Sequence, residues 1–221
     1  MSIVVKICGL STPEAVEAAL AAGADMLGFV RFAKSPRHIS LDVAQNLGRQ
    51  VGAQARKVLL TVEASDAELA AAIEALRPDL LQLHGRETPE QVAALKARFG
   101  LPVMKAIAVG EARDLASIAA YEEVADMILL DSRAADSVLP GGTGRAFDWS
   151  LLKDLKLRKP WLLAGGLNAG NVEAALKATH APGVDVSSGV ESTPGVKDLA
   201  KIAAFVAEAR AARLGSRAGT G

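Results

Sequence analysis

Eight short apolar runs recur along the whole chain, and they constrain the fold more than any other feature. Each run is too short for a helix and is rich in valine, leucine or isoleucine; the runs begin at Ile3, Met26, Lys57, Leu80, Pro102, Met127, Trp161 and Gly183. Near-continuous apolar runs of this length are typical of strands in a parallel sheet that is covered by helices. The pattern therefore predicts eight buried parallel strands.

The segments between these runs carry helix start signals. Thr12 and Thr88 each precede a proline and an acidic residue, as at an N-cap followed by the first helical turn. Capping boxes are predicted for Thr88 with Gln91 and for Ser65 with Glu68. Towards the end of the chain we expect a helix capped by Asn168, and a last helix from about Val196 with an apolar stripe of Leu199, Ile202, Ala203, Phe205 and Val206.

Alternating strands and helices predict an α/β fold, and eight strand–helix units favour a single (β/α)₈ TIM barrel. A doubly wound sheet of six or seven strands is the alternative, because it tolerates the same helices. No change of composition marks a second domain. We expect one barrel domain over residues 1–213 and a flexible tail over residues 214–221.

Charge and cysteine content exclude several classes of protein. The 25 basic and 25 acidic residues leave no net charge, which argues against nucleic-acid and membrane partners and for a small-molecule ligand. A single cysteine cannot form an internal disulfide or an all-cysteine metal site. No apolar stretch approaches the roughly 20 residues that span a bilayer, and no secretory signal is recognisable, so we expect a cytoplasmic protein.

The carboxyl ends of the strands surround the active site in a barrel of this kind. Side chains alternate along a strand, so Lys6 and Cys8 share one side of the first strand while Val5 and Ile7 share the other. If Val5 and Ile7 face the helices, the Cys8 thiol points across the barrel mouth. Asp131 closes the sixth run on a strand of a nearly opposite wall.

Asp131 shares a side of its strand with Leu129, so its carboxyl and the Cys8 thiol could face one cavity. Each residue also has a simpler interpretation. A lone cysteine on an apolar strand is often an inert small hydrophobe, and an aspartate at a strand end can merely cap the next turn. Position alone leaves both alternatives open.

Glycines follow the last two strands. Gly165 and Gly166 come after the seventh run, and Gly189 after the eighth. Backbone N–H groups and a helix N-terminus can surround a phosphate at this place in the fold, although ordinary turn chemistry is the competing explanation. We favour phosphate binding, because two such loops follow neighbouring strands.

Two connections are unusually long. Residues 132–147, with Gly141, Gly142 and Gly144, are a candidate mobile lid, and residues 32–40 are a candidate substrate-binding arm. Arg37 in this arm could bind a carboxylate through two parallel N–H bonds. A solvated surface arginine is the alternative.

Seven motifs together resemble the phosphoribosylanthranilate isomerase family of tryptophan biosynthesis: "KICGL", "SPRHIS", "LLQLHG", "ILLDS", "PGGTGRAFDW", "LLAGGLNAGNV" and "GVDVSSGVESTPGVKD". They occur in the family's order from residue 6 to about 200, and the combination is specific although each motif alone is weak. The resemblance implies an Amadori rearrangement of a phosphosugar, N-(5'-phosphoribosyl)anthranilate, to 1-(o-carboxyphenylamino)-1-deoxyribulose 5-phosphate. This is the third step of tryptophan synthesis from chorismate, and we expect it to be catalysed by a monomer or homodimer with no cofactor and no metal.

The resemblance also implies roles for individual residues. Cys8 matches the general base and Asp131 the general acid; Arg37 would hold the anthranilate carboxylate, and Asp185 would lie near the substrate amino group. His84 matches a family histidine and is expected at the substrate, with its role left open. The phosphate would be held by the two glycine loops, at Gly165, Gly166, Asn168, Ser187, Ser188 and Gly189.

Elementary chemistry agrees with these roles. Opening the ribose ring needs a proton on the ring oxygen, so Asp131 must carry one near neutral pH, which a dry setting favours. Cys8 can remove the proton of the adjacent sugar carbon only as a thiolate, and a free thiol has a pKa of about 8.5. We therefore expect a positive or well hydrogen-bonded neighbourhood that lowers the pKa of the Cys8 thiol.

Two rival functions remain. The sister isomerase of the histidine pathway resembles this chemistry but uses paired aspartates, and the residue that ends the first strand separates the two families; here it is Cys8. A non-catalytic phosphosugar-binding protein would keep the glycine loops and lose the acid and the base. Cys8 and Asp131 are both present, which argues against it.

Overall fold

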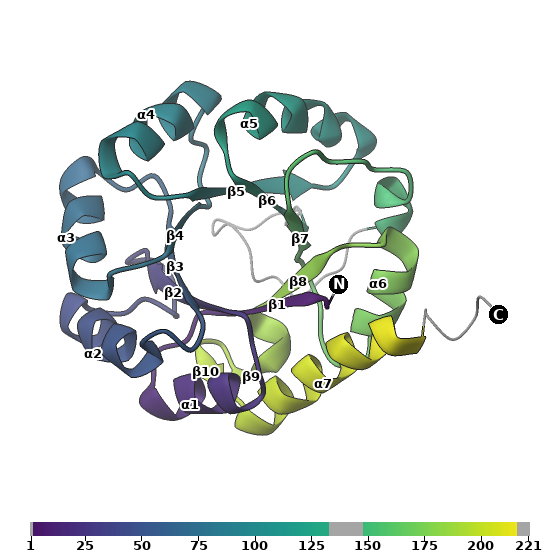
Figure 1. Ribbon diagram of the computed structural model, residues 1–221, viewed down its shortest axis with the longest axis horizontal. Coiled ribbons are helices and arrows are strands. Elements are labelled where there is room, and N and C mark those ends of the chain that lie inside the picture. The colour runs from purple at the N-terminus through teal and green to yellow at the C-terminus, as the bar shows by residue number, and fades with distance from the viewer. Residues whose placement is uncertain (1, 133–147, 216–221) are drawn as a thin grey trace.

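The computed structural model describes residues 2–132 and 148–215, and eight of its strands close into a barrel (Figure 1). Each barrel strand is parallel to its neighbours, and β1 pairs with both β2 and β8. The strands are β1 (Val4–Cys8), β2 (Met26–Arg31), β3 (Arg56–Thr61), β4 (Leu80–Leu83), β5 (Val103–Val109), β6 (Met127–Ser132), β7 (Trp161–Leu163) and β8 (Gly183–Val186). The predicted TIM barrel is confirmed, and the doubly wound sheet is excluded.

The α-helices form an outer ring around the strands (Figure 1). They are α1 (Pro13–Ala21), α2 (Leu41–Val51), α3 (Asp66–Leu76), α4 (Pro89–Phe99), α5 (Ile118–Val124), α6 (Val172–Thr179) and α7 (Leu199–Gly215). Short 3₁₀ helices add η1 (Ala112–Ser117), η2 (Trp149–Leu152) and η3 (Ser188–Val190).

The prediction that a helix follows each of the eight strands is wrong at one place. In the described part of the connection from β6 to β7, the 3₁₀ turn η2 stands where an α-helix was predicted. Leu152, Leu155 and Leu157 meet the core there at spacings of three and two residues. In an α-helix Leu152 and Leu155 could share one face, but Leu157, two residues later, would point to the other side, so a turn followed by irregular chain lets all three meet the core.

The predicted helix starts are confirmed at three helices. The Thr12 side chain accepts a hydrogen bond from a backbone N–H of α1. Ser65 with Glu68 and Thr88 with Gln91 both form reciprocal capping boxes, at α3 and α4. Each cap satisfies N–H groups that the first turn leaves without a helical partner.

Two predictions near the end of the chain are wrong. The N-cap residue of α6 is Asn171, not Asn168 as predicted. The Asn168 side chain instead accepts a hydrogen bond from Gly170 N within the loop. Val196 is not helical, because it pairs in the antiparallel hairpin of β9 (Glu191–Thr193) and β10 (Val196–Lys197). The chain reaches α7 only after this hairpin.

The buried stripe of α7 also differs from the prediction. Ile202, Phe205 and Val206 are buried as expected, but Leu199 is 44% exposed and Ala203 is exposed. Ala209 takes their place, because the helix starts later and presents the i, i+3, i+4, i+7 positions from Ile202 to the barrel. The helix continues to Gly215, past the expected boundary at residue 213, and residues 216–221 of the predicted tail lie outside the described residues.

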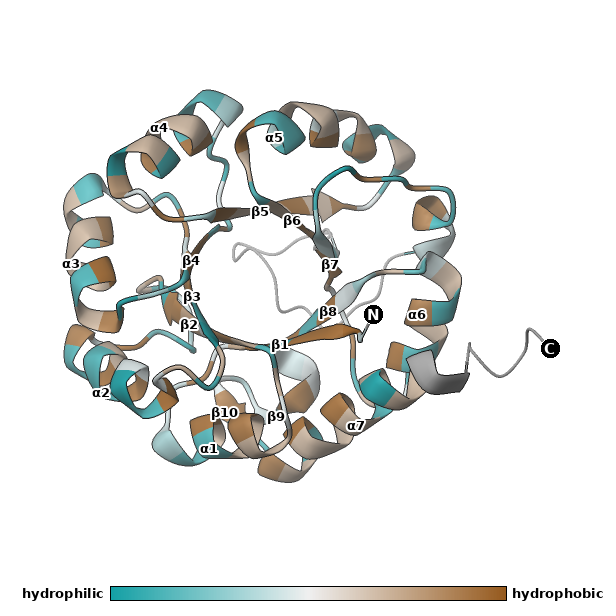
Figure 2. Cartoon of the chain, in the orientation of Figure 1, coloured by the Kyte–Doolittle hydropathy of each residue, from teal (hydrophilic) through white to brown (hydrophobic). Residues whose placement is uncertain are grey.

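Apolar side chains form two layers, one between strands and helices and one inside the barrel. The inner layer contains Val4, Met26, Val58, Leu80, Met104, Ala106, Met127, Leu129, Leu162 and Ala164. Brown apolar colour follows the strands, while teal polar residues occur on the outer helices (Figure 2). Because apolar side chains fill the barrel nearer the amino ends of the strands, the polar groups of the interior lie at the carboxyl ends.

No helix among the described residues has the length and apolar character needed to cross a membrane.

Candidate active site

The Cys8 side chain lies inside the barrel at the carboxyl end of β1. Val5 and Ile7 pack in the layer beneath the helices, whereas Cys8 packs with Val30 and Leu60 in a small inner cluster. The predicted alternation along β1 is therefore confirmed. The residue is only 3% exposed.

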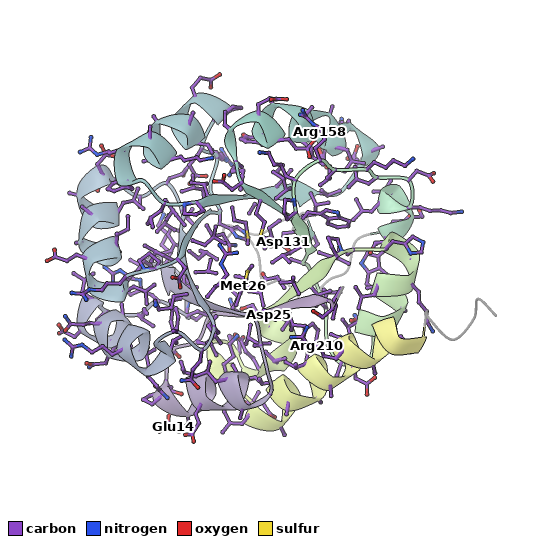
Figure 3. All side chains as sticks on the ribbon, in the orientation of Figure 1. Glu14, Asp25, Met26, Asp131, Arg158 and Arg210 are labelled. Atoms are coloured by element: carbon purple, nitrogen blue, oxygen red, sulfur yellow. The ribbon has the colours of Figure 1, made fainter. Side chains whose placement is uncertain are left out.

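Asp131 lies one residue before the end of β6, on the inner side of the barrel. Leu129, two residues earlier, belongs to the inner apolar layer, as alternation requires. Figure 3 shows Asp131 within the ring of strands, in contrast to Glu14 and Arg158 on the outside. At 7% exposure its carboxyl is nearly enclosed. The thiol and the carboxyl thus project into the barrel interior from different walls.

Burial raises the pKa of the Cys8 thiol above its ordinary value, so the expected lowering is wrong in its net direction. The ammonium groups of Lys6 and Lys197 act to lower the pKa, and the Asp185 carboxylate acts to raise it. Desolvation of the thiolate is the largest of these effects. The thiol is mostly protonated at neutral pH, and its thiolate, once formed, is a strong base.

Asp131 has His84 as its neighbour on the same wall of the barrel, with only β5 between their strands. His84 Nε2 lies 3.3 Å from Asp131 Oδ2, and His84 Nδ1 lies 2.9 Å from Gln82 Nε2. If the Gln82 amide donates to Nδ1, the Nε2 of His84 carries a proton and faces Asp131 Oδ2. His84, which the sequence placed at the substrate, therefore contacts the predicted acid directly.

A buried ion pair outside the barrel fixes the loop that carries His84. Lys105 Nζ lies 2.9 Å from Glu87 Oε2 and donates to the carbonyl oxygens of Gly85, at 2.7 Å, and Leu83, at 3.3 Å. The Tyr121 hydroxyl donates to the Glu87 carbonyl. This cluster ties β5 and α5 to residues 83–87.

We expect Lys105→Met to lower the free energy of unfolding by about 3–5 kcal/mol, because it leaves the Glu87 carboxylate buried without its partner. Urea unfolding measures the change. Lys177→Met is the matched control: it breaks the exposed pair of Lys177 with Glu173 and should cost less than about 1 kcal/mol. Equal losses in the two variants would show that the Lys105 pair has no special structural role.

Arg37 lies at the barrel mouth and already holds a carboxylate of this chain. Its Nε and Nη2 atoms donate to Glu191 Oε1 and Oε2 at 2.7 and 2.8 Å. Lys197 Nζ also donates to Glu191 Oε1, at 2.8 Å, and to Ser187 O, at 2.9 Å. Arg37 Nη1 makes no hydrogen bond to the described residues. Two cations around one carboxylate make this corner positive.

The two glycine loops after β7 and β8 touch each other. A Cβ placed on Gly189 would lie 1.8 Å from Leu167 O, so only glycine permits this contact. Gly165 and Gly166 directly follow Ala164 and have positive φ angles of 87° and 65°. Gly165 lies against Ser132, the residue after Asp131, and Ser187 lies near Gly9, the residue after Cys8, so the two loops form one surface beside the ends of β1 and β6.

The predicted phosphate-binding residues all lie in these loops. Ser187 precedes η3 and Ser188 is its first residue, and the Ser187 carbonyl accepts a hydrogen bond from Lys197. The Asn168 backbone N–H is already bonded to Asn171 Oδ1 at 2.8 Å, and the Asn171 amide donates to Gly166 O at 2.9 Å. Asn168 therefore orders its loop through bonds within the chain.

Sequence reasoning missed the functional neighbours Lys6, Gly28, Glu191 and Lys197. One signal was present, since Lys6 is a charged residue in an apolar strand on the same side as Cys8. Asp185, expected at the substrate amino group, accepts from Lys6 Nζ at 2.7 Å through Oδ1. Its Oδ2 makes no hydrogen bond to the described residues.

Some predictions fall outside what the structure describes. The candidate lid glycines Gly141, Gly142 and Gly144 lie in residues 133–147, which are not among the described residues. Within the described ranges, no group of three or more histidine, cysteine, aspartate or glutamate side chains is placed to hold a metal ion.

Comparisons with known proteins point to one family. The family model for N-(5'-phosphoribosyl)anthranilate (PRA) isomerase matches residues 5–208. The chain is 61% identical over 218 residues to N-(5'-phosphoribosyl)anthranilate isomerase of Beijerinckia indica subsp. indica, covering 98% of both chains. It is similar in structure to phosphoribosyl anthranilate isomerase from Thermotoga maritima, with a TM-score of 0.86 and 34% identity over 95% of this chain and 99% of that one.

A further solved structure is informative because of its ligand. It is phosphoribosyl anthranilate isomerase in complex with reduced 1-(o-carboxyphenylamino)-1-deoxyribulose 5-phosphate. The TM-score is 0.81 at 32% identity, over 95% of this chain and 99% of that chain.

Proposed function

Because the chain belongs to the N-(5'-phosphoribosyl)anthranilate isomerase family, we propose that Cys8 and Asp131 perform the acid–base chemistry of that reaction. The enzyme catalyses the Amadori rearrangement of N-(5'-phosphoribosyl)anthranilate to 1-(o-carboxyphenylamino)-1-deoxyribulose 5-phosphate in tryptophan biosynthesis. The observation that carries the proposal is the projection of both side chains into the barrel interior beside the glycine loops.

Asp131 acts first, as the general acid. It gives its proton to the ribose ring oxygen, the bond from that oxygen to the anomeric carbon breaks, and the nitrogen lone pair forms a Schiff base. The resulting Asp131 carboxylate then accepts a hydrogen bond from His84 Nε2, 3.3 Å away. His84 therefore stabilises the charge that forms on the acid.

Cys8 acts second, as the general base. Its thiolate removes the proton from the sugar carbon next to the Schiff base, and the electron pair moves to the nitrogen to give an enol amine. Tautomerisation of the enol then yields the keto product. Because burial raises the pKa of the thiol, the thiolate is a stronger base than an ordinary cysteine, although less of it is present at neutral pH.

Arg37 is the proposed site for the anthranilate carboxylate. Glu191 fixes the guanidinium by two hydrogen bonds, so its free Nη1 edge is held in place before substrate arrives. Asp185 Oδ2 is proposed to accept a hydrogen bond from the substrate amino group. The phosphate would lie on the loops of Gly165, Gly166 and Gly189, near the Lys197 ammonium.

We expect Arg37→Ala to raise KM by about 10- to 100-fold, with a smaller change in kcat, because a hydrogen bond to a charged group is worth about 1.5–3 kcal/mol. Steady-state kinetics and the affinity for an anthranilate-bearing ligand measure this. Arg49→Ala, which removes an exposed arginine in the last turn of α2, on the side of the barrel where the chain enters β3, is the control. Unchanged affinity in Arg37→Ala would refute the proposed carboxylate contact.

The proposed site residues that the structure describes all come from one chain, which suits the proposed monomer or homodimer. We place the enzyme in the cytoplasm, because a catalytic base that is a free thiol needs a reducing compartment.

The single experiment that tests the function is a fluorescence assay that follows consumption of phosphoribosylanthranilate. The purified protein should turn it over without added metal or cofactor, and the absence of turnover would contradict the proposal.

A further inference from the structure

Lys6 is a charged residue in a place that ordinarily excludes charge. It lies in the middle of β1 with no exposed surface, and its Nζ is 2.7 Å from Asp185 Oδ1. Lys6 and Asp185 face each other in the parallel register that closes the barrel. A buried ion pair is often no more stabilising than apolar residues of the same size. Stability alone therefore does not account for this pair.

The Lys6 ammonium and the Cys8 thiol face the same small space. Gly28 on β2 is in register with Cys8, and a Cβ added to it would lie 2.8 Å from Cys8 Sγ and 3.2 Å from Lys6 Nζ. Both groups thus approach β2 at the point where it has no side chain. Because Gly28 has no side chain, there is room beside it for both the Cys8 thiol and the Lys6 ammonium.

The other charged groups that face Cys8 are largely occupied with each other. Lys197 and Arg37, from the hairpin and the β2–α2 loop, share the Glu191 carboxylate. Asp131 and His84 pair on the opposite wall, and Val30 and Leu60 contribute only apolar surface. Asp185 is the remaining anion, and it is held by Lys6 itself.

We propose that Lys6 is a positioning residue for the base: its ammonium group, fixed by Asp185, stabilises the Cys8 thiolate that the proposed function requires. Burial acts to lower the pKa of Lys6, but Asp185 and Cys8 raise it above its ordinary value, so the group stays charged at neutral pH. The same ammonium is the strongest influence that lowers the pKa of the Cys8 thiol against the effect of burial. The inference rests on the proposed function, since it acts through Cys8.

The test uses the fact that Cys8 is the single cysteine of the chain. Its rate of alkylation by iodoacetamide as a function of pH reports the thiol pKa without any need for turnover. In Lys6→Met we expect alkylation at neutral pH to be slower by about tenfold or more, because an opposite charge nearby moves a pKa by about one to three units. The whole profile should move to higher pH.

Lys197→Met is the matched control, because it makes the same change at another buried ammonium, one that shares its carboxylate with Arg37. We expect a smaller shift there. An unchanged profile in Lys6→Met, or an equal shift in Lys197→Met, would overturn the inference.

A second variant covers the case in which Lys6→Met does not fold. Lys6→Met/Asp185→Asn removes both buried charges and leaves none unpaired, and circular dichroism verifies its fold. Alkylation should still be slower than in the wild type, because Lys6 acts on the thiol more strongly than Asp185 does. Wild-type alkylation in this variant would contradict the inference. Turnover by Cys8→Ala would instead contradict the proposed function, so the two failures are distinguishable.

Discussion

Replacing Cys8 by alanine should lower kcat by about 10²- to 10⁴-fold, the range that a general base contributes. The loss is expected because no other group of the described residues inside the barrel at β1 can take the proton from the sugar carbon. Single-turnover fluorescence of phosphoribosylanthranilate measures the chemical step. Binding of reduced 1-(o-carboxyphenylamino)-1-deoxyribulose 5-phosphate should survive, since the arginine and the glycine loops are unchanged.

Cys8→Ser is an informative companion to the alanine variant. A serine hydroxyl has nearly the same shape but ionises far less readily than a thiol, so it should be almost as inactive as alanine. Stability should change little, because the side chain is small and lies in a small cluster with Val30 and Leu60. Turnover near the wild-type rate in either variant would remove Cys8 from the mechanism.

Replacing Asp131 by asparagine should lower kcat by a similar factor of about 10²- to 10⁴-fold. The amide keeps the size of the carboxyl and can still contact His84, but it cannot deliver a proton to the ring oxygen. Rapid-mixing measurements should show that ring opening is lost while the product analogue still binds.

Asp154→Asn is the control for this substitution, because it makes the same chemical change at an exposed position after η2. It should leave kcat unchanged. If Asp131→Asn also kept wild-type kcat, another residue would have to supply the proton.

The sequence was most informative where a local rule decides the outcome. The alternation of side chains along a strand, with a period of two, decides which face of its strand Cys8 or Asp131 occupies. The capping boxes involve residues only three positions apart. The count of strands likewise follows from local apolar runs. These features need no knowledge of which strands meet.

The features that were missed depend on contacts between distant parts of the chain. The pairing of Lys6 with Asp185 exists only because β1 meets β8 when the barrel closes. The Arg37 guanidinium meets Glu191 because a hairpin follows β8, where a loop and then a helix from about Val196 were expected. The raised pKa of Cys8 has the same origin, since burial is set by packing rather than by neighbours in sequence.

The most direct measurement of the central claim is a crystal structure of this chain with reduced 1-(o-carboxyphenylamino)-1-deoxyribulose 5-phosphate bound. We predict the sulfur of Cys8 and the carboxyl of Asp131 on either side of the sugar chain, each within contact distance of it, with the phosphate on the two glycine loops. A ligand that touches only one of these two side chains, or a Cys8 sulfur turned away from the sugar, would contradict the account.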